Sequence, residues 1–217
     1  MPRRLFKLFL GRIPKLKMQV NTTQLKNKQR IYIGGNHGAN KIFDICTHVL
    51  LSIKKSVDFY RYGEANLLTD SPIVIIKGAE ELVDKQASFH SFEPHILLIH
   101  RVKEDLPNGY SSFEQYVSEI EKLADNLPKS GSLIYFEDDD VAILLGKKER
   151  EDVRAFSYTA LEGEKTVDGF KIKTTAGPIF LTTNNDKFLK HAAGAKALLN
   201  RLGVTDDEFF KALKSFN

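Results

Sequence analysis

A short apolar run that enters a glycine-containing loop and then a helix is the feature of this sequence that most constrains its fold. The run is residues 31–33, the loop begins at Gly34, and an apolar stripe of helical spacing follows over residues 42–53. A strand, a glycine loop and a helix in this order point backbone N–H groups and the positive end of a helix dipole at an anion. The sequence therefore predicts an anion-binding loop at the end of a strand.

Two chemical groups of a common phosphate-binding loop are missing here. In the pattern G-x-x-x-x-G-K-[ST] the lysine contacts phosphates and the hydroxyl holds Mg²⁺. Residues 34–41 read G-G-N-H-G-A-N-K, so Ala39 and Asn40 stand where the lysine and the hydroxyl residue are expected. In one alternative, Lys41 is a displaced substitute for the lysine. The predicted phosphate-binding loop consists of Gly35, Asn36, His37, Gly38, Ala39, Asn40 and Lys41.

The net charge of +4 is unevenly distributed along the chain. Residues 1–30 carry nine Arg and Lys and no acidic residue, which leaves the remainder at −5. An acidic domain argues against binding to nucleic acid. The single cysteine, Cys46, excludes an internal disulfide and falls in the apolar stripe, so we expect it in the core of a protein from a reducing, cytoplasmic compartment.

Residues 1–25 form a basic segment that also carries apolar side chains. Its apolar run, residues 8–10, is too short for a signal peptide or a membrane span. Two interpretations stay open: the apolar side chains pack on the domain, or the segment contacts an anionic membrane surface or a partner. We predict a separate basic segment over residues 1–25 and one domain over residues 26–217.

Strands alternate with helices along the rest of the chain. Alternation of this kind predicts an α/β fold with a doubly wound, mostly parallel sheet and flanking helices. The two residues before Pro178 separate two apolar runs, which is typical of a small antiparallel hairpin near the C-terminal part. The predicted strands are residues 31–33, 57–60, 73–77, 95–100, 132–136 and 153–158, and the hairpin is residues 170–174 and 178–183. The predicted helices follow Ser112, surround residues 141–145, run over 188–202, and follow Thr205.

Four segments, in this order, are similar to the central ATP-binding domain of the Mur ligases. Residues 35–41 resemble the family loop G-T-H-G-K-T-T, and residues 93–106 resemble its strand that ends in a D-H pair. Residues 112–140 resemble its helix and strand that end in N-x-D-D, and residues 191–216 resemble the helix pair that closes the domain. The resemblance implies a P-loop type fold and a relation to ATP-dependent amide formation in peptidoglycan precursor synthesis.

The resemblance also implies where metal and nucleotide groups belong, and several are replaced. The family glutamate that binds magnesium falls at Lys77, and the D-H pair falls at Asp105 and Leu106. The asparagine that faces adenine falls at Phe136, and the His-Asn pair before the penultimate helix falls near Lys187. Bound Mg²⁺ is therefore not expected, and no metal ligands are assigned.

Several alternatives stay open at these positions. Lys77 is a candidate stand-in for the metal charge that pairs with Asp105, while Glu80 or Glu81 is a candidate replacement metal ligand. The ribose and adenine side is assigned to Phe136, Asp138 and Asp139, although the two aspartates also fit a solvated turn that starts a helix. The remaining histidines have no metal-ligand spacing and fit surface or satisfied core positions: His48, His90, His95, His100 and His191.

Two function classes follow. The first is a non-catalytic binding or regulatory module, a pseudoenzyme that recognises a nucleotide such as ATP or another phosphate-bearing ligand and acts on a ligase or another cell-wall protein. The second is a working ATP-dependent acid–amino acid ligase, of the type that extends UDP-N-acetylmuramate, completed by domains on other chains. Mg²⁺-dependent hydrolysis of ATP distinguishes the second class from the first.

Overall fold

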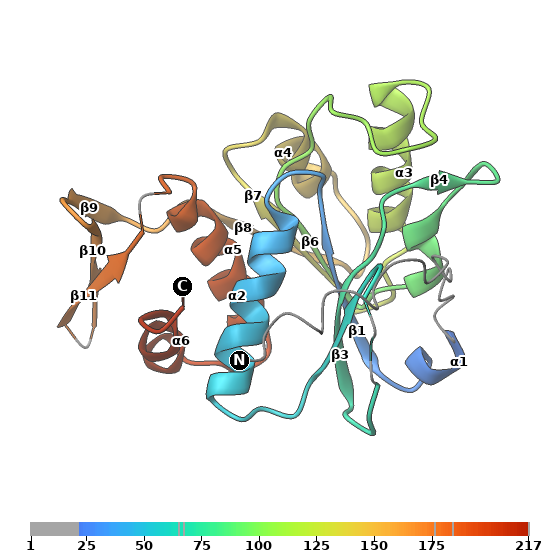
Figure 1. The fold of residues 1–217 in the computed structure, drawn as a ribbon. Helices are drawn as coiled ribbons and strands as arrows, with labels where there is room; N and C mark the ends of the chain where they lie inside the picture. Colours follow the sequence, from blue (N-terminus) through green and yellow to red (C-terminus); the bar gives the residue numbers. More distant parts are fainter. Residues whose placement is uncertain (1–21, 65, 67, 176, 184, 217) are drawn as a thin grey trace, which may run out of the picture.

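Six parallel strands form the central sheet in the computed structural model, which describes residues 22–64, 66, 68–175, 177–183 and 185–216 (Figure 1). The strand order is β2-β3-β1-β6-β7-β8, with the first strand of the chain near the middle and later strands added on both sides. The strands are β1 (Gln29–Gly34), β2 (Asp58–Arg61), β3 (Ile73–Lys77), β6 (Ile96–Ile99), β7 (Ser132–Phe136) and β8 (Arg154–Tyr158). The predicted doubly wound parallel sheet is confirmed.

Helices cover both faces of this sheet, as Figure 1 shows. One face packs against α2, α5 and α6, and the other packs against α3 and α4, so each face has its own apolar cluster. The helices are α1 (Thr22–Leu25), α2 (Ala39–Ser52), α3 (Phe113–Asp125), α4 (Asp140–Lys147), α5 (Phe188–Arg201) and α6 (Asp206–Leu213), with a 3₁₀ turn η1 (Ser88–Phe92).

Strand β1 is buried on both faces, which explains its unbroken apolar run. Ile31 and Ile33 face the α2 side, while Tyr32 faces the α3 side. Side chains alternate across a strand, so a strand covered by helices on both faces needs apolar residues at every position. Strand β6 follows the same rule over all four of its residues. Because β3, β1 and β6 are parallel neighbours in the sheet, their carboxyl ends lie side by side at the glycine loop.

Helix boundaries follow local capping groups. Ser112 accepts a hydrogen bond from the backbone N–H of Gln115 and begins α3. Thr205 and Glu208 form a complete capping box at the start of α6. After α5, Gly203 adopts a left-handed φ of 75°, which favours glycine at a helix end. The two predicted helix starts and the predicted helix end are confirmed.

The predicted hairpin is present, but it belongs to a sheet of three strands. Strands β10 (Gly169–Thr174) and β11 (Gly177–Thr182) pair antiparallel, and β9 (Gly163–Thr166) pairs with the other edge of β10. Strand β9 has the sequence GEKT and is mostly exposed, so it carries no apolar alternation that identifies it. A second pair, β4 (Leu82–Val83) with β5 (Gln86–Ala87), is shorter still and was not predicted.

Part of the predicted basic segment lies within the described chain. Residues 22–25 form α1, and Leu25 is buried against the domain. Residues 1–21, which carry the apolar run, lie outside the described residues. Over the described residues, no helix is long and apolar enough to cross a membrane.

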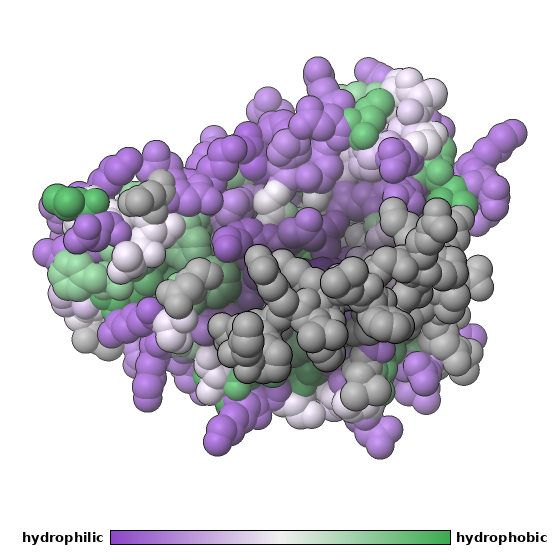
Figure 2. Space-filling model, in the orientation of Figure 1, coloured by the Kyte–Doolittle hydropathy of each residue, from purple (hydrophilic) through white to green (hydrophobic). Residues whose placement is uncertain are grey.

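Figure 2 shows a largely hydrophilic face in the orientation of Figure 1, with apolar residues gathered over the small sheet. Exposed apolar side chains of this small sheet region include Val167 and Phe180.

Candidate functional site at the glycine loop

A cavity of about 700 Å³ opens at the carboxyl ends of β1, β2 and β3. Open α/β sheets bind ligands at this edge, outside the carboxyl ends of their strands. The cavity is lined by the loop residues Gly35, Asn36, Gly38, Ala39 and Asn40, by Arg61, Tyr62 and Glu64 from the end of β2 onward, by Lys77, Gly78, Ala79, Glu80 and Glu81 from the end of β3 onward, and by Asp105 and Pro107. The predicted loop is therefore part of a cavity of ligand size.

The loop is held by the segment that follows β6. The side-chain amide of Asn36 donates to the carbonyl groups of Lys103 and Asp105, both at 2.7 Å, and accepts from the Lys103 N–H at 2.9 Å. Gly35 has a φ of 102°, and a Cβ there would lie 2.6 Å from the Arg101 carbonyl oxygen. At Gly35 the backbone therefore passes closer to the segment after β6 than a residue with a side chain allows.

Gly38 begins α2 with a left-handed φ of 83° and has no side chain to cap the helix. The first backbone N–H groups of a helix have no partner within the helix, so they suit an anion. Asn40 is exposed and lines the cavity, while Ala39 is buried. Lys41 points elsewhere: its Nζ lies 4.8 Å from the centre of the Phe216 ring, beside a different cavity. Lys41 is therefore not among the residues that line this cavity, and its position gives no support to the alternative in which it replaces the loop lysine.

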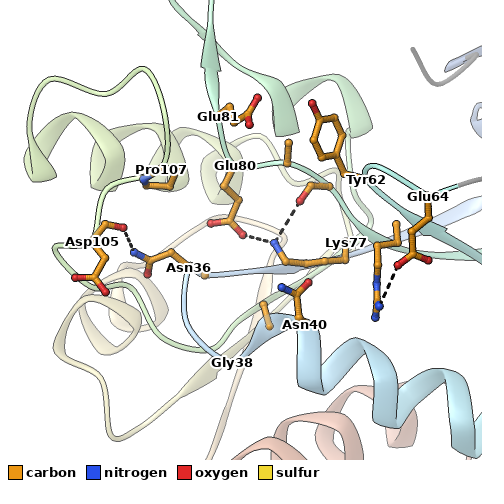
Figure 3. Close-up of a pocket in the computed structure, with 15 residues that line it drawn as sticks. Asn36, Gly38, Asn40, Tyr62, Glu64, Lys77, Glu80, Glu81, Asp105 and Pro107 are labelled. Carbon is orange, nitrogen blue, oxygen red and sulfur yellow. Dashed lines mark hydrogen bonds and ion pairs between the residues drawn. The ribbon is translucent and has the colours of Figure 1, made fainter. Parts of the chain in front are cut away.

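Lys77 lines the same cavity as the loop, and Figure 3 shows its ammonium directed at Glu80. The Nζ atom lies 2.8 Å from Glu80 Oε1 and donates to the Gly78 carbonyl at 3.3 Å. Glu80 also accepts a hydrogen bond from the Tyr116 hydroxyl. Burial, together with the Glu80 carboxylate, raises the pKa of Tyr116 far above its ordinary value, so the hydroxyl remains a donor. Lys77 and Glu80 thus form a buried, nearly neutral unit.

Asp105 does not pair with Lys77, which corrects the predicted pair. Its carboxylate Oδ2 lies 2.7 Å from His37 Nε2, and Figure 3 shows Asp105 on the far side of the cavity from Lys77. The reason is geometric, because Asn36 binds the Asp105 backbone and fixes that residue beside the loop. Lys77 instead finds its counter-ion three residues along its own chain, at Glu80.

The residues at the carboxyl end of β3 do not fit a magnesium ion. Lys77 places an ammonium, which cannot be a metal ligand, where an oxygen ligand is needed; its charge alone repels a dication about 4 Å away by about 8 kcal/mol at an effective dielectric of about 20, and the Glu80 carboxylate offsets part of this. Glu80 is a poor replacement ligand, because Lys77 and Tyr116 already contact its carboxylate. Glu81 also lines the cavity, yet one further carboxylate does not make a site for a cation that needs several oxygen ligands.

The residues predicted for the ribose and adenine side lie away from this cavity. Phe136 is fully buried, with its ring centre 4.7 Å from that of His100 and 5.2 Å from that of Tyr158. Asp138 forms an exposed ion pair with Lys190. None of the residues that line the cavity comes from β7, α4 or α5.

Asp139 begins a helix, as the alternative interpretation of these aspartates predicted, but it is buried rather than solvated. It is buried, and its Oδ1 accepts from the N–H of Ala142 at 3.1 Å, which begins α4. The same oxygen accepts from the Val102 N–H at 3.3 Å, and its Oδ2 pairs with Lys103 at 2.7 Å. Asp139 therefore joins the start of α4 to the segment after β6.

Sequence reasoning did not predict that His100 and His191 meet directly behind Gly38. A Cβ on Gly38 would lie 2.6 Å from His100 Cδ2 and 2.6 Å from His191 Nε2. The two histidines are 91 positions apart along the chain, one after β6 and one in α5, so no spacing rule connects them. We expect core histidines to have hydrogen-bond partners at both nitrogens. That expectation is wrong here, because His100 Nε2 and His191 Nδ1 have no partner among the described residues.

Gly38→Ala is expected to lower the free energy of unfolding by about 2 kcal/mol, through left-handed backbone strain and overlap with the two histidine rings. The matched control is Gly203→Ala, where φ is also left-handed, at 75°, but nothing lies within 4 Å of the added Cβ. This control should cost about 1 kcal/mol, the backbone strain alone. Urea unfolding of both variants measures the difference, and equal losses would show that the rings do not contact Gly38 as described.

The fold and the glycine loop define an α/β domain like the central domain of the Mur ligases. No protein-family model matches the chain. In sequence it is 24% identical over 206 residues to the UDP-N-acetylmuramate–L-alanine ligase of Clostridium novyi (strain NT), covering 88% of this chain and 44% of that one. The chain thus spans less than half the length of this curated relative.

Solved structures of Mur ligases share the fold. The UDP-N-acetylmuramate:L-alanyl-γ-D-glutamyl-meso-diaminopimelate ligase from Neisseria meningitides aligns with a TM-score of 0.73 and 15% identity, over 89% of this chain and 67% of that chain. The UDP-N-acetylmuramate–alanine ligase from Thermotoga maritima aligns with a TM-score of 0.66 and 20% identity, over 89% of this chain and 46% of that chain. The recognised resemblance to the Mur ligase central domain is confirmed at the level of fold.

Proposed function

We propose that this domain is a non-catalytic binding module that holds a phosphate-bearing ligand at the loop of residues 35–38 without a metal ion. The observation that carries the proposal is the Lys77–Glu80 ion pair in the cavity, at the position where the resemblance assigns a magnesium ligand. The absence of both a lysine and a hydroxyl residue at positions 39 and 40 supports the same interpretation. We also propose that the domain regulates peptidoglycan precursor synthesis by acting on a ligase or another cell-wall protein.

The binding chemistry depends on backbone groups rather than on a cation. The N–H groups at the start of α2 and the helix dipole attract an oxyanion, and the helix is 14 residues long. Lys77 adds a donor, because an ammonium has three N–H groups and the described contacts, to Glu80 and Gly78, use two of them. The third is available to a ligand in the cavity.

Titration calorimetry with inorganic phosphate and with ATP, each in EDTA and in excess Mg²⁺, tests this proposal. We expect the phosphate affinity to be the same in both conditions within a factor of about 2, since the metal has no site here. Lys77→Gln should weaken binding about tenfold, by removing the ammonium while keeping an amide. Lys129→Gln is the control, because Lys129 is 90% exposed and lies outside the cavity.

Two results would contradict the proposal. Binding that requires Mg²⁺, or Mg²⁺-dependent release of ADP when ligase domains are supplied on another chain, would favour the ATP-dependent acid–amino acid ligase. Unchanged phosphate affinity in Lys77→Gln would remove the assigned role of the ammonium. Circular dichroism of each variant separates lost binding from lost folding.

A further inference from the structure

Two buried histidines lie directly behind the anion-binding loop. His100 follows β6 and is 0% exposed, and His191, in the first turns of α5, is 8% exposed. Their ring centres are 5.2 Å apart in an edge-on arrangement, and both rings contact the position of Gly38. Gly38, the N-cap residue of α2, therefore packs against both imidazole rings.

Each ring has a nitrogen without a hydrogen-bond partner in the described part of the chain. His100 Nδ1 lies 2.7 Å from the Tyr158 hydroxyl, while its Nε2 is buried and unpartnered. That Nε2 atom lies 2.9 Å from the Cβ position of Gly38, so it is aimed at the start of α2. His191 Nδ1 is buried and unpartnered as well. Unpaired buried polar atoms are rare in folded proteins, and they suggest a role beyond packing.

The surroundings of the pair are cationic. Four positive side chains act on His191 from three elements: Lys41 on α2, Lys187 and Lys190 at the start of α5, and Arg101 after β6. The side chains that face His100 are His191, Arg101, Lys190, the Tyr158 hydroxyl on β8 and the Phe136 ring on β7.

The nearby carboxylates are already paired. Asp138 is bound by Lys190, and Asp139 is bound by Lys103. Burial first, and the neighbouring charges second, lower the pKa of His100 to about 3 and that of His191 to about 4. Both rings are therefore neutral at pH 7 while the loop is empty.

Resting on the proposed function, we propose that His100 and His191 are the titratable partners of the oxyanion held at residues 35–38, so that anion binding takes up a proton and strengthens in acid. An anion in front of the loop supplies the negative charge that this cationic region lacks. The proton comes from solvent and goes to an unpartnered ring nitrogen, and no covalent bond changes. The histidine pair then supplies, in acid, the positive charge that the absent loop lysine does not.

The expected size of the effect follows from charge proximity. An opposite charge about 4–6 Å away raises the pKa of an imidazole by about 2. If the pKa of His191 rises from about 4 in the empty site by that amount on binding, affinity increases about tenfold between pH 7.5 and pH 5.0. Binding near pH 6 should also take up a measurable fraction of a proton.

Sulfate is the probe, because its charge does not change between pH 5.0 and pH 7.5. Calorimetry of the full chain in two buffers of different ionisation enthalpy gives the affinity and the proton uptake together. We expect an affinity gain of about tenfold at pH 5.0 and proton uptake at pH 6. His191→Gln and His100→Gln should each reduce both the affinity gain at pH 5.0 and the proton uptake at pH 6.

The matched control is His37→Gln, which removes the loop histidine that Asp105 already contacts at 2.7 Å. This variant should keep most of the gain in sulfate affinity at pH 5.0 and most of the proton uptake at pH 6. Sulfate binding in the wild-type chain without proton uptake and without pH dependence would overturn the histidine proposal while the proposed function stands. No sulfate or phosphate binding at either pH would overturn both. If His100→Gln does not fold, His191→Gln and the wild-type proton uptake still decide the question.

Discussion

Lys77→Met is expected to lower the free energy of unfolding by about 3–5 kcal/mol. The substitution leaves the Glu80 carboxylate, whose side chain is 6% exposed, without its cation at 2.8 Å. Removing one partner of a buried ion pair strands the other charge, which costs far more than the pair contributes as a whole. Urea unfolding at pH 7 measures the loss.

The double variant Lys77→Met/Glu80→Gln separates a stranded charge from lost packing. Because it removes both charges and its new side-chain amide can still accept from the Tyr116 hydroxyl, it should recover most of the lost stability. Lys129→Met is the surface control, since Lys129 is 90% exposed beside Asp152 and should change stability by less than about 1 kcal/mol. A double variant as unstable as Lys77→Met would show that the cost does not come from Glu80.

Acid is expected to destabilise the free domain by about 3 kcal/mol between pH 6.5 and pH 5.0 through His100 and His191. The pKa of each ring lies below the ordinary value of 6.5, at about 3 and about 4 in the folded chain. The unfolded chain therefore binds more protons than the folded chain in this pH range. Stability is complete above pH 6.5, falls as the pH drops below it, and stops falling below the folded pKa values.

Urea unfolding at pH 7.5, 6.5 and 5.0, without added anions, tests this expectation. His100→Gln and His191→Gln should each remove about half of the loss, because each deletes one of the two groups. His95 contributes in the same direction, since burial and the charge of Arg30 lower its pKa. Some loss of stability with falling pH should therefore persist in either variant. A wild-type stability that stays constant from pH 7.5 to pH 5.0 would contradict the buried, neutral state of the pair.

The sequence predicts the layered α/β fold because each central strand and helix carries its own periodic signal. The unbroken apolar run of β1, the capping box at Thr205 and the glycine at position 203 are local signals, and each is where it was expected. Strand β9 escapes prediction because its four residues, GEKT, lie mostly exposed at a sheet edge and need no apolar side chains.

The candidate site is only partly readable from the sequence. The loop and the missing lysine and hydroxyl are visible, because they are contiguous. The partner of Lys77 is not visible: Asp105 was the predicted partner, but Asn36 fixes Asp105 beside the loop and Lys77 pairs with Glu80. The contact between His100 and His191 depends on how α5 packs against the sheet, and no local pattern encodes that packing.

The three hydrogen bonds of Asn36 have a consequence for the kinetics of ligand capture. They fix residues 35–38 against residues 103–105 before any ligand arrives. A site that is already shaped spends little conformational entropy when it is filled. Association should therefore be a single diffusional step, in which the observed binding rate rises linearly with ligand concentration. A slow closure of the loop after the first encounter would instead make that rate level off.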